Sequence, residues 1–370
     1  MNDQQMSNVI DQEFDDLDEI NEILPKFYSI TSYGADYPVD GLVKRLNEGN
    51  IIVPRVGEQR DDSLSVVGFQ RNFVWTKAQS DRFIESLLLG LPVPGIFLVK
   101  EKNGKLLVLD GQQRLLTLCA FYNGIIRKRE FTLEYVQQRF KGKKYSTIDN
   151  SEKLKLDDYI IHATIIRQDE PEEEQSSIYL IFERLNSGST LLQPQEIRAA
   201  LYHGAFSDLL ADLNDNKNWR IICGKKTSRL KDVEIILRFL ALYYYRKHYK
   251  KPMKSFLNKY MAINRDLGKQ SGDEISRIFS NTVTEISEHI GPTAFRPSSA
   301  LNVAVADSVM VGVAARLKKG RIKNKKGLKK AHAELLENKL YIDLISGSTA
   351  DEENVGKRLE MAIEAFSLVD

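Results

Sequence analysis

The stretch Leu106-Leu107-Val108-Leu109-Asp110-Gly111-Gln112-Gln113-Arg114 decides the fold of the first half of the chain. Its first four residues are apolar and about one strand long, and the apolar residues of 115–121 follow a helical pattern that ends near Gly124. Upstream lies a second apolar run, 95–100, and Asn103-Gly104 between the two runs is the strongest short signal for a hairpin. The sequence therefore predicts a β-hairpin whose second strand enters a helix through an Asp-Gly turn.

Further elements are expected on both sides of this hairpin. Alternating or apolar runs predict strands at 26–33, 50–54 and 159–166. Thr76 and Gln79 have the spacing of a capping box, which predicts a helix from Lys77 to about Gly90. Periodicity predicts other helices over 39–47, the basic stretch 127–144, 178–185, 194–203, 233–245, 255–263, 275–290, 301–317 and 355–367. We expect an α+β fold, with a small mixed sheet in the first part and an all-helical C-terminal domain.

The charged residues are unevenly distributed, although the formal net charge is only +2. Residues 1–24 carry eight acidic side chains and no Lys or Arg, so we expect a solvated, flexible arm. Competition of this arm for the protein's own basic surface is the alternative. Residues 316–330 carry nine basic side chains and no acid, which fits either a solvated loop or a contact for nucleic-acid phosphates. A chain of 370 residues suits two domains after the arm, 25–205 and 206–370.

Several protein classes are disfavoured by what the sequence lacks. The only cysteines, Cys119 and Cys223, have no CxxC or Cys/His cluster nearby, which argues against a disulfide framework and a zinc site. The five histidines show no HExxH spacing, and neither a P-loop nor a GxGxxG fingerprint is present. No signal peptide and no apolar run of about 18 residues is seen, so we expect a cytoplasmic protein without a membrane span.

The turn at Asp110–Arg114 has the features of an anion site. The first amides of a helix lack intrahelical partners and bind anions well. Gly111 permits torsions or a close approach that a side chain would prevent, Arg114 could hold phosphate oxygens, and Asp110 could orient a magnesium ion or a water. An arginine in the first turn opposes the helix dipole, so an anion should compensate it. The structural alternative is a salt bridge between Arg114 and Asp110.

Three other places carry polar residues of interest. Gln70-Arg71 offers a second guanidinium, or only a surface charge beside the packed Phe73 and Trp75. Asn186 and Gly188 could present amides or a metal-directed oxygen, or simply end a helix. Glu196 is either a partner of a helix N-terminus or a base that activates water.

Four motifs together resemble the N-terminal domain of GmrSD-type restriction endonucleases, a ParB/sulfiredoxin-like family. They are QRNFVW at Gln70–Trp75, VLDGQQR at Val108–Arg114, FERLNSGSTL at Phe182–Leu191 and QEIRAALYHG at Gln195–Gly204. The resemblance covers roughly residues 25 to 205, and MKSFLNKYM at Met253–Met261 resembles the helical continuation of such proteins. It implies a ParB/sulfiredoxin-like core in a bacterial anti-phage defence protein, directed at foreign and often modified phage DNA.

The resemblance also implies a nucleoside triphosphate, GTP or ATP, at the DGQQR turn. Carried over onto this chain, the family's signature falls on Asp110, Gly111, Gln112, Gln113 and Arg114, its upstream motif on Gln70 and Arg71, and its downstream motif on Asn186 and Gly188. We expect Asp110, Arg114 and Arg71 to be catalytic, Asp110 to orient Mg²⁺ as well, and the other six to bind the nucleotide. Fuller members append an HNH-like nuclease domain that this sequence lacks, which makes a separate nuclease subunit a candidate partner.

Three functions stay open at this point. The first is a nucleoside triphosphatase that couples turnover to DNA sensing, with Arg71 and Arg114 stabilising phosphate charge. The second is a non-catalytic DNA-binding or regulatory module that recruits a nuclease. The third is direct cleavage by the ParB-like core, which needs carboxylates such as Glu183 or Glu196 near Asp110. The tyrosines at 243–245 leave a homo-oligomer open, although a partly buried helix explains them equally well.

Overall fold

The computed structural model describes residues 14–15, 29–54, 75–170, 176–185, 193–227 and 229–370. The chain forms two compact units. The sheet unit consists of residues 28–191 and 199–201, and the helical unit consists of residues 1–27, 192–198 and 202–370. Helix α7 (Pro194–Leu201) contributes to both.

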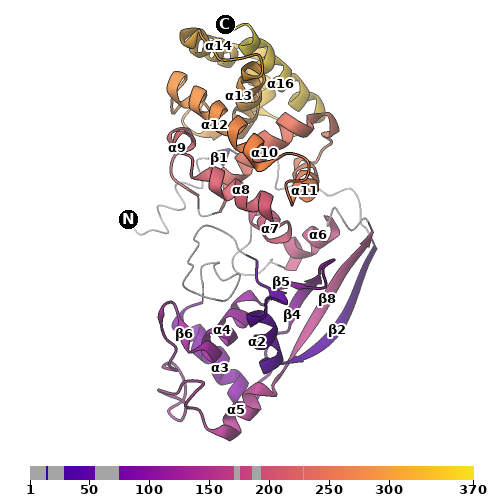
Figure 1. Ribbon diagram of the computed structural model, residues 1–370, viewed down its shortest axis with the longest axis vertical. Helices are drawn as coiled ribbons and strands as arrows, with labels where there is room; N and C mark the ends of the chain where they lie inside the picture. The colour runs from indigo at the N-terminus through magenta and orange to yellow at the C-terminus, as the bar shows by residue number, and fades with distance from the viewer. Residues whose placement is uncertain (1–13, 16–28, 55–74, 171–175, 186–192, 228) are drawn as a thin grey trace. The chain divides into compact units, whose positions relative to one another are not determined.

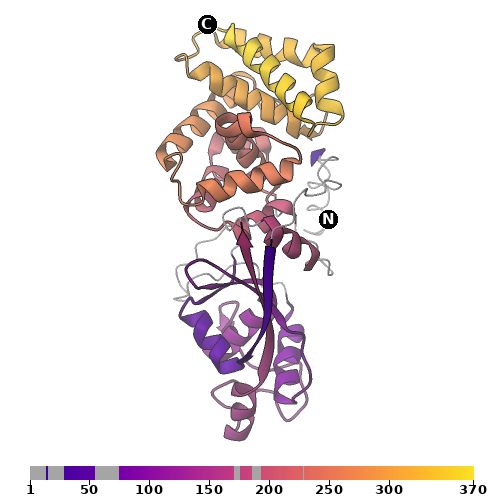
Figure 2. The ribbon, with the colours of Figure 1, turned by 90° about the vertical axis from the view of Figure 1, so that its right-hand side faces the viewer.

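A five-stranded mixed sheet is the scaffold of the sheet unit (Figure 1). Its order is β2-β8-β4-β5-β3, where β4 and β5 form an antiparallel hairpin, β8 runs parallel to β4 and antiparallel to β2, and β3 runs parallel to β5. The long strands β2 and β8 lie side by side along their length (Figure 2). The strands are β2 (Ser29–Pro38), β3 (Ile51–Ile52), β4 (Ile96–Lys100), β5 (Leu106–Asp110) and β8 (Ile160–Glu170).

Helices surround this sheet and share its core. Thr76 and Gln79 form the capping box that the sequence predicted, so α3 begins at Lys77. Leu98 and Val108 of the hairpin are fully buried in one cluster with Ile84 of α3 and with Leu115 and Leu118 of α4. The helices of the unit are α2 (Val39–Asn47), α3 (Lys77–Leu88), α4 (Gln112–Asn123), α5 (Asn150–Asp157) and α6 (Ser176–Leu185). The expected α+β fold with a small mixed sheet is confirmed.

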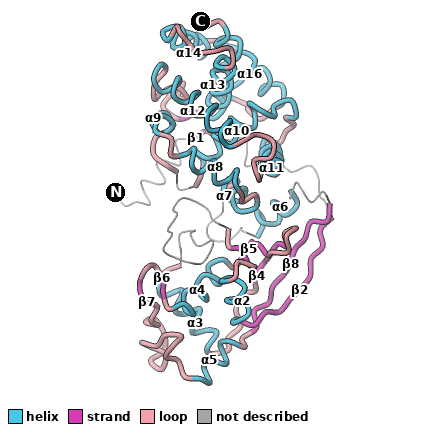
Figure 3. The backbone as a smooth tube through the Cα atoms, viewed as in Figure 1, coloured by secondary structure: helices cyan, strands magenta, loops and turns pink. Residues whose placement is uncertain are grey.

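The basic stretch 127–144 is not helical, contrary to the sequence prediction (Figure 3). It begins with the turn of a small hairpin between β6 (Ile125–Ile126) and β7 (Arg129–Glu130), in which Arg127 and Lys128 adopt positive φ angles of 49° and 63°. Beyond it, the buried carboxylate of Asp81 accepts hydrogen bonds from two backbone amides, those of Glu134 and Tyr135, each at 3.0 Å. These two amides thus donate to a side chain of α3 instead of to backbone carbonyls of a helix.

The helical unit is built around α13 (Val303–Leu317), where thirteen of fifteen residues are buried. Helices α10, α12 and α16 pack against it, and a Cβ at Gly312 would lie 2.8 Å from the carbonyl oxygen of Ala362 on α16. The all-helical prediction is confirmed, apart from a short pairing of β1 (Phe14–Asp15) with β9 (Leu301–Asn302). The other helices are α8 (Ala205–Asn214), α9 (Lys217–Cys223), α10 (Lys231–Tyr245), η1 (Arg246–His248), α11 (Met253–Asn264), α12 (Gly272–His289), α14 (Lys325–Glu337), α15 (Lys339–Ser346) and α16 (Glu352–Ser367).

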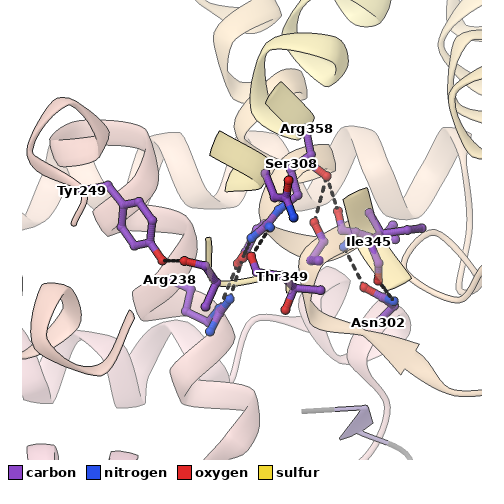
Figure 4. Close-up of polar contacts among 12 residues, drawn as sticks. Arg238, Tyr249, Asn302, Ser308, Ile345, Thr349 and Arg358 are labelled. Carbon is purple, nitrogen blue, oxygen red and sulfur yellow. Dashed lines mark hydrogen bonds and ion pairs between the residues drawn. The ribbon is translucent and has the colours of Figure 1, made fainter. Parts of the chain in front are cut away.

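A buried ion cluster joins three of these helices. Asp307 of α13 is fully buried and accepts hydrogen bonds from Arg238 of α10 at 2.8 and 3.1 Å and from Arg358 of α16 at 3.2 Å. Figure 4 labels the two arginines of this cluster, Arg238 and Arg358, and also Thr349, whose carbonyl oxygen accepts a hydrogen bond from Arg358. Because each charge is shielded from water, the carboxylate must stay paired for the helices to remain packed. None of the helices that the structure describes has the length and apolarity of a membrane span.

Candidate functional site

The Asp-Gly turn lies where the sequence placed it, between β5 and α4. Asp110 is the last residue of β5, and Gly111 is the N-cap of α4 with φ 94° and ψ 10°, in the left-handed region. A glycine has no side chain with which to cap the first amides of the helix. The amides of the first turn of α4 therefore need other partners, which is the condition for an anion site.

Gly111 is required at this turn for two reasons. Its positive φ would be strained for any residue with a side chain, although Asn and Asp tolerate this region better than the others. In addition, a Cβ at this position would lie 2.4 Å from Cγ2 of Ile96 and 3.3 Å from Nη2 of Arg114. The close approach of the turn to the neighbouring strand β4 leaves no room for even one methyl group.

Arg114 and Asp110 form the salt bridge that the structural alternative predicted. Nη2 of Arg114 donates to Oδ2 of Asp110 at 2.7 Å, one helical turn apart. The Arg114 side chain is only 13% exposed, whereas that of Asp110 is 45% exposed. The pair compensates the arginine at the helix N-terminus, but it does not use the whole guanidinium. Nε of Arg114 is buried and has no hydrogen-bond partner among the residues that the structure describes.

Gln112 supplies a second buried polar atom without a partner. The residue is 7% exposed, and its Oε1 has no hydrogen-bond partner within the described part of the chain. An unsatisfied buried polar atom costs about 1–3 kcal/mol, so folded proteins seldom retain one without a reason. Within one turn of helix, the described residues thus leave a buried acceptor on Gln112 and a buried donor on Arg114 unsatisfied.

Gln113 has a different role, which the sequence did not reveal. Its Oε1 accepts a hydrogen bond from the backbone amide of Trp75 at 3.3 Å, and the carbonyl oxygen of Trp75 accepts one from Arg127 at 2.8 Å. Trp75 is the residue after the undescribed stretch 55–74, and it stacks edge-on against Phe83. Gln113 therefore ties the chain that enters α3 to the first turn of α4.

The remaining residues predicted for the site lie outside the described residues. These are Gln70, Arg71, Asn186 and Gly188. The chain next to both motifs is nevertheless placed: Trp75 bonds to Gln113, and α6, which ends one residue before Asn186, packs on β5 and β8. Both neighbouring segments thus contact the strand or the helix that forms the Asp-Gly turn.

Glu196, one of the two glutamates considered as a catalytic base, is engaged at the start of α7. Glu196 is 5% exposed, accepts a hydrogen bond from the amide of Gln193 at 2.7 Å, and pairs with Arg229 at 3.3 Å. These contacts are those of a helix N-terminal partner. Across the described part of the chain, no group of three or more His, Cys, Asp or Glu side chains could hold a metal ion.

The two cysteines have the character of packing residues. Both are buried, and burial raises the pKa of the Cys119 and Cys223 thiols to about 12. A thiol with such a pKa stays protonated near neutral pH and is a poor nucleophile.

One segment of the chain, which contains the Asp-Gly turn, is similar to a known family. Residues 49–203 match the family of the GmrSD restriction endonuclease, N-terminal domain. The GmrSD-type segment includes the turn 110–114 and both motifs that lie outside the described residues. It begins after β2 and α2, so the sheet unit contains more than the matched segment. A search of curated proteins finds no match to the chain.

Proposed function

We propose that this protein binds a nucleoside triphosphate at the Asp110–Arg114 turn and acts on DNA in bacterial restriction and anti-phage defence. The family match over residues 49–203 supports the restriction context and DNA as a partner. The observation that carries the nucleotide proposal is a pair of buried atoms at a helix N-terminus, Oε1 of Gln112 and Nε of Arg114, which the described residues leave without a hydrogen bond.

The phosphates would lie against the first turn of α4. Amides of a helix N-terminus and a guanidinium are the usual donors to phosphate oxygens. Arg114 is preorganised for this role, because Asp110 holds one of its nitrogens while Nε stays available. Gln112 would accept a hydrogen bond from a hydroxyl or amino group of the nucleotide, since its unpaired atom is an oxygen.

Asp110 would hold Mg²⁺ together with the phosphates. Magnesium is commonly bound by one or two carboxylates, with phosphate oxygens and waters completing the shell. Asp110 fits this mode because its side chain is 45% exposed and stands at the start of the proposed phosphate site. Hydrolysis would then require Arg114 and Arg71 to stabilise the developing phosphate charge.

Direct DNA cleavage by this core has less support. The described residues contain no carboxylate cluster for metal ions at Asp110, and Glu196 is engaged in capping α7 and pairing with Arg229. A two-metal nuclease site needs such a cluster. The non-catalytic alternative is a DNA-binding or regulatory module that holds a nucleotide, or none, and recruits a separate nuclease subunit. It predicts DNA binding without nucleotide turnover.

Nucleotide binding and phosphate release test the proposal. Each of the four ribonucleoside triphosphates is titrated in Mg²⁺ against the wild type and Arg114→Ala, and phosphate release is measured without DNA, with plain DNA and with modified DNA. A charge-assisted hydrogen bond contributes about 1.5–3 kcal/mol, so Arg114→Ala should weaken binding by roughly 10- to 100-fold. The control is Arg129→Ala, which removes an exposed arginine of β7 in the same unit.

The outcomes separate the hypotheses. Arg114-dependent binding together with phosphate release supports the nucleoside triphosphatase. Binding without release supports a nucleotide-holding regulatory module. Equal binding by the wild type and by folded Arg114→Ala would refute the phosphate role of the turn.

A further inference from the structure

A strongly basic surface lies on the helical unit, outside the candidate nucleotide site. It consists of residues 318–330, which we call the basic segment, and it joins the end of α13 to the first turns of α14. We propose that the basic segment binds the phosphate backbone of duplex DNA. This inference rests on the DNA-directed role proposed above and names the surface that contacts the DNA.

The cations of the basic segment are exposed and mostly unpaired. The segment contains no acidic residue, and all eight of its Lys and Arg side chains are exposed. Among the described residues, two of these cations have a side-chain partner. Nζ of Lys330 forms an ion pair with Oε1 of Glu334 at 3.6 Å, and Nζ of Lys318 lies over the ring of Tyr243, 5.6 Å from its centroid. The eight residues are Lys318, Lys319, Arg321, Lys323, Lys325, Lys326, Lys329 and Lys330.

The backbone of the segment is fixed by the core beneath it. Ile322 and Leu328 are 4% and 0% exposed, so two apolar anchors hold the segment on the unit. Buried Arg316 donates to the carbonyl oxygen of Gly320 at 3.0 Å, and the side chain of Asn324 accepts from the amide of Gly327 at 2.8 Å. The cations are therefore displayed from an ordered surface rather than from a solvated loop, which lowers the entropy lost on binding.

The placement of these lysines at the start of α14 works against the stability of the helix. Its first turn contains Lys325 and Lys326 and no acidic residue, whereas α12 begins with Asp273 and Glu274. A cation near a helix N-terminus opposes the macrodipole by about 0.3–1 kcal/mol. The backbone oxygen of Asp370 accepts hydrogen bonds from the amides of Lys323 and Asn324 at this end of the helix, at 3.0 and 2.6 Å. A polyanion bound to the lysines would compensate their unfavourable interaction with the helix dipole.

The composition of the segment indicates duplex DNA rather than a single strand. Proteins that bind single-stranded nucleic acids combine basic residues with aromatic side chains on which bases stack. Residues 318–330 include no Phe, Tyr or Trp. A run of cations without stacking groups suits the phosphates of a duplex, where affinity depends strongly on salt and little on sequence.

The test measures the salt dependence of DNA binding without nucleotide. A labelled 30-base-pair duplex is titrated between about 50 and 200 mM NaCl against the full-length wild type and the variant K325Q/K326Q/K329Q/K330Q. The slope of log K against log salt changes by about 0.9 for each phosphate contact, so the variant should lose up to about 3.6 from the slope. A matched control, K217Q/K225Q/K247Q/K269Q, removes four exposed lysines from other parts of the helical unit.

Two readouts decide the result. The proposal expects a shallower slope and weaker duplex binding for the α14 variant alone, with a melting temperature equal to or above that of the wild type because the unfavourable dipole interaction is removed. The proposal would be overturned if both variants lost duplex binding equally or if neither lost any. It would also be overturned if the α14 variant lost binding to single-stranded RNA but bound the duplex as the wild type does. Since nucleotide is absent, failure here leaves the proposal for Arg114 untouched, and the reverse also holds.

Discussion

Gly111 is the residue at which the candidate site tolerates least change. Gly111→Ala would combine a strained positive φ with a clash against Ile96, whereas Gly104→Ala in the β4–β5 turn, φ 81°, meets no atom within 4 Å. Backbone strain of this kind costs about 1–3 kcal/mol. Urea unfolding should therefore show a clearly larger loss for Gly111→Ala than for Gly104→Ala, together with weaker nucleotide binding in Gly111→Ala alone. Equal losses would mean that the approach to Ile96 relaxes without cost.

Single residues also show how far the site could be predicted from the sequence. The strand-to-helix turn and the choice between an anion site and an Asp110–Arg114 salt bridge followed from local rules, and the salt bridge is present. The bond between Gln113 and the amide of Trp75 could not be predicted, because it joins residues 38 positions apart. Local patterns specify a turn, but they do not specify which distant backbone group a glutamine will meet.

At the scale of elements, the buried carboxylate of Asp307 controls how α13 packs against α10 and α16. Asp307→Asn keeps the size of the side chain but removes the buried negative charge with which Asp307 pairs Arg238 and Arg358. Breaking a buried ion pair from one side costs about 3–5 kcal/mol. We expect a loss of this order in the unfolding free energy measured with urea.

The matched control for this prediction is Asp343→Asn, at an exposed position of α15. It should change stability by less than about 0.5 kcal/mol, as is usual for surface substitutions. If Asp307→Asn were equally mild, the two arginines would have to find other partners, and the cluster would not be holding the helices together.

Elements with strong end signals were predicted best. The capping box of Thr76 and Gln79 placed the start of α3, and the predicted helix 39–47 coincides with α2. The helix predicted for 127–144 was wrong because the amides of Glu134 and Tyr135 bond to the side chain of Asp81, which belongs to a helix about fifty residues earlier. A tertiary contact of this kind overrides local propensity and leaves no periodic signal in the sequence.

For the whole molecule, the distribution of charge is more informative than its sum. The net charge of the chain is only +2, yet residues 1–24 carry eight acidic side chains and residues 316–330 carry nine basic ones. The basic run was expected to be a loop or a phosphate contact; in the structure it ends α13 and starts α14, with Arg316 buried. Three expectations stay predictions: the ParB/sulfiredoxin-like character of the core, the limits of the two domains, and the binding of a nucleotide at the turn.

The stability of the molecule should also depend on pH through one buried histidine. His332 of α14 is 7% exposed, and its Nε2 lies 2.8 Å from the carbonyl oxygen of Ala294. Burial lowers the pKa of His332 below its ordinary value of 6.5, an effect that the bond to Ala294 only partly offsets. The unfolded chain therefore binds the proton more readily than the folded one, and folding stability falls as the pH drops below about 6.5.

The measurement is the unfolding free energy at pH 7.5 and pH 5.5 for the wild type and His332→Gln. Each pH unit between the two pKa values of His332 removes up to about 1.4 kcal/mol from the wild type. The variant has no imidazole to protonate, so its loss between the same two pH values should be smaller by the contribution of His332. All other titrating groups are common to both proteins and cancel in this double difference. An identical pH dependence in the two proteins would mean that the folded unit accepts the proton at position 332 as readily as the unfolded chain does.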